Sequence, residues 1–149
     1  MLKIYYFLIP GICVMANSLM AQTDFKVVEQ TSSMSKGSYN CLTVEIKGSD
    51  LRTVNKSWSS FIKGYKGKTT TDKKTNESFS DDVSIKTMSE NTVDIYARPT
   101  MQDERIKMSV WFNLGVTYLS AKDHPERYAA GEKVVMDFAY YASADLEHV

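Results

Sequence analysis

The sequence is poor in the residue types on which metal sites and covalent catalytic centres depend. It has two cysteines and two histidines, too few for a zinc site of the usual Cys and His spacing. No serine stands in a Gly-x-Ser-x-Gly turn, which exposes a nucleophilic hydroxyl. His124 precedes a predicted helix, where a structural role is favoured, and His148 is close to the C-terminal residue. We therefore predict a protein that is not an enzyme and holds no metal or cofactor.

The chain also lacks an apolar run long enough to span a bilayer. Its longest run, residues 4–15, is interrupted by Pro10-Gly11 and is shorter than the roughly 20 residues of a transmembrane helix. Lys3 precedes this run and Ala21 follows it as a small residue at a suitable cleavage position. This pattern predicts a signal peptide over 1–21 and a periplasmic or secreted protein. An uncleaved N-terminal anchor is the alternative.

Removal of that segment would leave Cys41 as the single cysteine of the mature chain. No intramolecular disulfide can then form, although exported proteins fold in oxidising compartments. A lone thiol in such a compartment is either buried or bridged to a partner. Both alternatives stay open on sequence grounds.

Charge of neither sign predominates, because 18 Lys and Arg balance 18 Asp and Glu. This balance argues against a nucleic-acid partner. Basic residues nevertheless gather between residues 47 and 74, and acidic residues gather between 77 and 104. Four of the cations share the outer side of a predicted helix: Arg52, Lys56, Lys63 and Lys66. This basic face is either an ordinary solvated surface or a patch for a membrane or polysaccharide surface of negative charge.

A strand followed by a helix is the clearest pattern in the chain. Residues 39–47 alternate, with Leu42, Val44 and Ile46 on one side. Gly48-Ser49-Asp50 favours a turn and a helix N-cap. The apolar residues after it recur at spacings of three and four, which predicts an amphipathic helix ending near Gly67. Its stripe is made of Leu51, Val54, Trp58, Phe61, Ile62 and Tyr65.

Further strands are predicted from threonine content and from period-two alternation. We expect strands near 68–71, 83–85 and 92–99, and a long one over 105–118. A last helix begins at Pro125 and continues toward the C-terminal end. Residues 22–37 form an N-terminal arm with a short edge strand at most, so the single domain covers 38–149. Helices on one side of an antiparallel sheet are typical of α+β domains. The predicted fold is a two-layer α+β sandwich of four to five strands with two helices on one face, in a ferredoxin-like arrangement.

Alternation also defines the sheet face that no predicted helix covers. Two large aromatic residues, Tyr96 and Trp111, belong to it. Either the arm over 22–37 or a hairpin over 68–79 folds across this face, or the face is an open platform for a partner protein or a second copy of the chain. The predicted interaction face consists of Cys41, Glu45, Tyr96, Arg98, Lys107 and Trp111.

Several segments together resemble exported domains of unknown function from Bacteroidetes-type bacteria. They are Met34-Ser-Lys-Gly, Leu42-Thr-Val-Glu-Ile, Val54-x-x-x-Trp58-x-x-Phe61, Tyr65-Lys-Gly-Lys68 and Val110-Trp-Phe-Asn-Leu-Gly115. The resemblance covers most of 34–149. It implies export and brings no activity or site residue.

The leading functional hypothesis is thus a non-catalytic exported module that binds a protein partner, or itself as a homodimer, through the face around Tyr96 and Trp111. The alternative is a binding domain for an anionic envelope component, either lipid or polysaccharide, through the basic face of the first helix.

Overall fold

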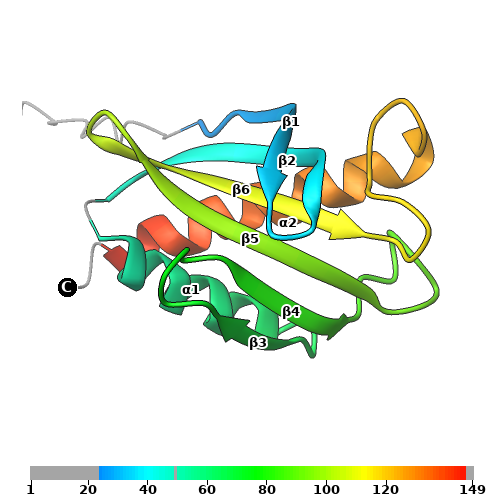
Figure 1. The fold of residues 1–149 in the computed structure, drawn as a ribbon, viewed down its shortest axis with the longest axis horizontal. Helices are drawn as coiled ribbons and strands as arrows, with labels where there is room; N and C mark the ends of the chain where they lie inside the picture. Colours follow the sequence, from blue (N-terminus) through cyan, green and yellow to red (C-terminus); the bar gives the residue numbers. More distant parts are fainter. Residues whose placement is uncertain (1–23, 49, 147–149) are drawn as a thin grey trace, which may run out of the picture.

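The computed structural model describes residues 24–48 and 50–146, and the predicted signal peptide lies outside them. One antiparallel sheet of six strands has the order β1-β2-β6-β5-β4-β3, and both helices lie on the same side of it (Figure 1). The elements in chain order are β1 (Val27–Met34), β2 (Gly37–Lys47), α1 (Leu51–Lys63), β3 (Lys68–Thr71), β4 (Ser78–Val83), β5 (Val93–Gln102), β6 (Arg105–Asn113) and α2 (Pro125–Leu146).

The α+β class and the placement of two helices on one sheet face are confirmed. The prediction of four to five strands is wrong, because the arm contributes a full strand. β1 pairs with β2 along all eight of its residues. β1 was hard to recognise as a full strand in the sequence because many of its residues are polar. An edge hairpin exposed on one side needs few apolar side chains. Two strands precede α1 and four follow it, an order that differs from the βαββαβ order of ferredoxin-like domains.

Helix α1 begins at its predicted cap and ends earlier than predicted. The Asp50 carboxylate accepts hydrogen bonds from the Thr53 hydroxyl at 2.7 Å and the Arg52 amide at 3.1 Å, and these two bonds lower its pKa. The helix ends at Lys63 with Gly64 as its C-cap, so the predicted end at Gly67 is wrong. Gly67 is needed for space instead. A Cβ there would overlap Ile62 Cγ2 and would lie 2.9 Å from a methyl group of β4.

The alternating residues predicted to face the helices do form the main core. Trp58 of α1 and Phe138 of α2 meet edge to face in its centre, with ring centroids 5.0 Å apart. Each fully buried side chain of this size stabilises the fold by roughly 1.5–3 kcal/mol. The sheet contributes Leu42, Val44, Ile46, Val93, Ile95, Ala97, Ile106, Met108, Val110 and Phe112.

Strand β6 is shorter than its sequence pattern predicts. It ends at Asn113, and a turn follows in which Gly115 has a φ of 102°. Val116, which continues the alternation in the sequence, is fully exposed. The chain returns through Leu119, whose amide bonds back to Phe112 O at 2.9 Å, and then enters α2 at Pro125. The alternation of apolar residues alone could not reveal this turn, because the same residues are compatible with a continuing strand and with a turn.

The second face of the sheet is covered by the tip of the β1–β2 hairpin, residues 31–40. β2 pairs with β6 only from Leu42 onward, whereas its pairing with β1 continues to the turn. The free part of the hairpin therefore bends across β6 and β5, on the side opposite the helices (Figure 1).

Candidate functional site

The aromatic centre of the predicted interaction face is buried. Trp111 has no exposed surface and Tyr96 is 9% exposed; with Cys41 and Met34 they form a small second core, here called the hairpin-side cluster. The prediction of an open aromatic platform is wrong, and the alternative that the arm folds over this face is confirmed. Met34, at the end of β1, supplies the apolar side chain that closes the cluster.

Polar contacts fasten the hairpin tip to the sheet. Arg98 donates to Ser33 O at 2.5 Å, and its guanidinium lies 5.5 Å from the centre of the Trp111 ring. Trp111 Nε1 donates to the carbonyl of Tyr39 at 3.2 Å. The buried Glu77 carboxylate accepts from the Ser35 amide at 3.1 Å and pairs with Arg98 at 3.6 Å. Arg98 therefore serves the fold, although the sequence placed it in an interaction face.

Cys41 is 1% exposed beneath the hairpin tip. Burial raises the pKa of its thiol from the usual value near 9.0 to about 11, although the charge of Lys107 acts in the opposite direction. The thiol is thus neutral at physiological pH and shielded from oxidants. Of the two alternatives for this cysteine, burial is the one that the structure shows.

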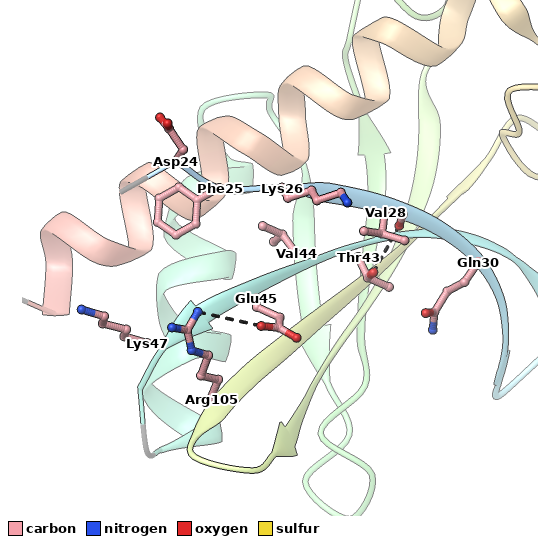
Figure 2. Close-up of a pocket in the computed structure, with 10 residues that line it drawn as sticks. All are labelled: Asp24, Phe25, Lys26, Val28, Gln30, Thr43, Val44, Glu45, Lys47 and Arg105. Carbon is pink, nitrogen blue, oxygen red and sulfur yellow. Dashed lines mark hydrogen bonds and ion pairs between the residues drawn. The ribbon is translucent and has the colours of Figure 1, made fainter. Parts of the chain in front are cut away.

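The remaining two members of the predicted face lie on its uncovered part. Glu45 is exposed and stands opposite the half-exposed Lys107 in the β2–β6 register. A pocket of about 420 Å³ opens beside Glu45. The Arg105 guanidinium is directed at the Glu45 carboxylate (Figure 2), and the two groups lie 3.9 Å apart. Two carboxylates and three cations line this pocket together, so it has no strong preference for the charge of a ligand.

A groove between α1 and the β3–β4 hairpin brings together part of the predicted basic face. Arg52 and Lys56, one helical turn apart, line it from α1, and Lys73 lines it from the hairpin turn. Its volume is about 720 Å³. No carboxylate is among its lining residues, which are Arg52, Asn55, Lys56, Ser59, Ser60, Thr71, Lys73 and Asn76. We call this site the basic groove.

The other two predicted basic residues lie outside the groove. Lys63 is exposed on the same side of α1, seven residues after Lys56, and occupies the last turn of the helix. Lys66 is exposed in the turn after α1 and has a left-handed φ of 64°. Both add positive charge at the C-terminal end of the helix without lining the groove.

Asn55 fixes the width of the basic groove. Its side chain is 6% exposed; Nδ2 donates to Asn76 O at 3.0 Å, and Oδ1 accepts from the Ser78 hydroxyl at 3.3 Å. The helix is thereby joined to the turn that carries Lys73. A buried amide with both ends paired is costly to replace, so the two walls of the groove are held at a defined separation.

Sequence reasoning missed Lys73 and the polar groups that accompany it. These residues fall in a segment predicted as a hairpin turn, and nothing in that segment shows where the turn lies relative to the helix. The order of the elements in the chain could have indicated where this turn lies. A hairpin that follows directly after α1 and runs antiparallel returns beside that helix, which places its turn against the N-terminal half of α1.

A scan against protein-family models and searches of curated proteins and of solved structures found no match to this chain. Within residues 24–48 and 50–146, no three His, Cys, Asp or Glu side chains are grouped so as to hold a metal ion. No helix in the same part of the chain has the length and apolar character needed to cross a membrane.

His124 has a structural role at the start of α2. It accepts at Nδ1 from the Ser120 amide at 3.3 Å and so orders the start of this helix.

Proposed function

We propose that this protein is a non-catalytic, exported binding domain for an anionic polysaccharide, which it holds in the basic groove. The observation that carries the proposal is the set of three cations, Arg52, Lys56 and Lys73, around a groove that no carboxylate lines. Export is part of the proposal and rests on the signal-peptide pattern of residues 1–21.

The cations of the groove are available to a ligand. Arg52, Lys56 and Lys73 are exposed, and none forms an ion pair with another described residue. The walls between them carry hydroxyl groups from Ser59, Ser60 and Thr71 and the side-chain amide of Asn76. A sugar polymer presents hydroxyl groups together with spaced carboxylates or sulfates, and this lining matches both kinds of group.

The shape of the site favours a polysaccharide over a lipid surface. The cations surround a recess, whereas a flat bilayer touches the projecting parts of a protein. Membrane-bound surfaces also insert aromatic or aliphatic side chains between lipids. The exposed large apolar side chains in the described part of the chain lie outside α1, β3 and β4: Val28, Tyr39, Met101, Val116, Tyr140 and Tyr141.

The proposal is tested by calorimetric titration of the protein with polygalacturonate, with neutral dextran as the control polymer. We expect binding of polygalacturonate alone, and the affinity should fall as salt is added because the cations are exposed. Arg52→Glu combined with Lys56→Glu should weaken binding about tenfold or more. Glutamate is a good helix former, and at position 52 it also suits the first turn of α1, so the variant should fold.

Lys122→Glu is the matched control, because Lys122 is an exposed lysine in the segment before α2, away from the groove. It should change the affinity less than twofold, as expected for a remote surface charge. Equal affinity of the groove variant and the unaltered protein would refute the proposal. So would binding that added salt does not weaken.

A further inference from the structure

A second hollow lies on the hairpin-covered face of the sheet, away from the basic groove. It opens between the β1–β2 hairpin and the segment that joins β6 to α2, and it has a volume of about 670 Å³. Three tyrosines line it, together with a lysine, an amide and a carboxylate: Tyr39, Tyr96, Tyr118, Lys36, Asn113 and Asp123. We call this site the tyrosine hollow.

The aromatic rings in the hollow are held close together. Tyr39 and Tyr118 stack with their centroids 4.1 Å apart and their planes at 22°. Tyr39 keeps 37% of its surface exposed and Tyr96 keeps 9%. Burial, and then the neighbouring phenols of Tyr96 and Tyr39, raise the pKa of Tyr118. The ring of Tyr39 is therefore the most accessible aromatic surface that the hollow offers to a ligand.

Hydrogen bonds across the hollow keep its walls in place. Asn40 Nδ2 donates to Leu119 O at 2.9 Å, which joins the hairpin to the segment before α2. Trp111 Nε1 donates to the Tyr39 carbonyl and so holds the backbone that carries one ring of the stack. Gly37 provides room for Tyr39, since it has a φ of 135° and a Cβ there would lie 3.2 Å from Tyr39 Cε2. The hollow is therefore a formed feature of the fold.

The polar groups of the hollow retain capacity to bind. The phenol hydroxyls of Tyr39, Tyr96 and Tyr118 form no hydrogen bond with another described residue. Asn113 uses Oδ1 to accept from the Gly115 amide at 2.9 Å, which leaves its Nδ2 donor free. The positive charge of Lys36 and the negative charge of Asp123 balance each other in the lining of the hollow. The site thus offers donors and acceptors and no excess of either sign.

We infer that the tyrosine hollow binds a neutral saccharide. The C–H face of a sugar ring is flat and apolar and packs against an aromatic ring, while the hydroxyls at its edge both donate and accept hydrogen bonds. The hollow supplies both kinds of contact, and its volume lies within the range of roughly 300–1,000 Å³ for ligand sites. Its balanced charge separates it from the basic groove. The inference does not depend on the function proposed for that groove.

The test is titration with neutral hexasaccharides of glucose, of mannose and of N-acetylglucosamine, followed by amide chemical-shift mapping. At least one should bind, with shifts centred on residues 36–40 and 113–118. Tyr39→Ala should weaken binding about tenfold. The Trp111 hydrogen bond survives this change, because its acceptor is a backbone oxygen. Tyr118→Phe keeps the stacked ring and removes one hydroxyl, so it should weaken binding about threefold.

Tyr140→Ala is the control, since Tyr140 is an exposed tyrosine on α2, and it should leave saccharide binding unchanged. The Arg52→Glu and Lys56→Glu double variant should also bind neutral hexasaccharides normally, which separates this inference from the groove proposal. Failure of all three hexasaccharides to bind would overturn the inference. Equal weakening by Tyr39→Ala and Tyr140→Ala would do so as well.

Discussion

The two faces of the sheet are closed in different ways. On one face, two helices bury a large core of aliphatic and aromatic side chains. On the other, the hairpin tip contributes Met34 and covers Cys41, Tyr96 and Trp111, and it is fastened by hydrogen bonds and one ion pair. The packing of the helices is stabilised mainly by buried apolar area, so it tolerates the loss of a single polar contact. The packing of the hairpin tip depends on its polar contacts, because the apolar area that it buries is small.

The two tryptophans allow the sharpest comparison, since both are fully buried, one on each face. Trp58 Nε1 has no hydrogen-bond partner among the described residues, whereas Trp111 Nε1 donates to Tyr39 O. Trp58→Phe removes a buried unpaired donor along with ring volume, so the two effects offset each other. Trp111→Phe loses similar volume and also leaves a carbonyl without its donor. We expect Trp111→Phe to cost about 1–2 kcal/mol more in urea unfolding.

Each of these variants also isolates the other tryptophan, because the chain has two in all. Both single-tryptophan proteins should emit at the short wavelengths of a buried indole and shift to longer wavelength on unfolding. A greater loss of stability for Trp58→Phe would contradict the comparison. So would emission typical of a solvated indole from the protein that retains Trp111.

A smaller and more local effect is expected at the ion pair that fastens the hairpin. Glu77→Gln removes the charge that pairs with Arg98 and weakens the acceptor of the Ser35 amide. Because Arg98 is 26% exposed, we expect a loss of about 1–2 kcal/mol rather than the larger cost of a fully buried pair. Amide hydrogen exchange should accelerate in residues 31–40 and stay unchanged in α1 and α2. Uniform acceleration over both faces would show that the hairpin does not open separately.

Another expected effect is confined to alkaline pH. The folded state raises the pKa of Cys41 to about 11 from a usual value near 9.0, so it keeps a proton that the unfolded chain releases. The free energy of unfolding therefore carries a contribution that is fully present below pH 9 and is lost as the pH rises toward 11. In Cys41→Ala this part of the alkaline decline should disappear. Identical pH profiles for the two proteins would contradict the assignment.

Much of the helix-covered face could be predicted from the sequence, because one buried side of each element produces a regular pattern. The alternation at Leu42, Val44 and Ile46 and the stripe containing Trp58 both identified core residues correctly. The hairpin-covered face could not be predicted in the same way. Its covering strand is polar, and Trp111 has the sequence spacing of an exposed position although the structure buries it.

The candidate site shows the same limit. Helical spacing placed Arg52 and Lys56 on one side of α1, and the structure confirms that both line one groove. The third cation, Lys73, comes from a turn 17 positions later, and only the return of the β3–β4 hairpin beside α1 brings it there. Spacing within one element is recorded in the sequence, whereas proximity between elements depends on how the chain packs.

The most direct test of the account compares two neighbouring lysines of that turn. Lys73 lines the basic groove and Lys74 does not, although both are exposed and carry the same charge. Calorimetric titration with polygalacturonate should show that Lys73→Glu weakens binding about fivefold or more, while Lys74→Glu changes it less than twofold. Equal effects of the two substitutions would mean that the polymer responds to overall charge, and would contradict a binding site in the groove.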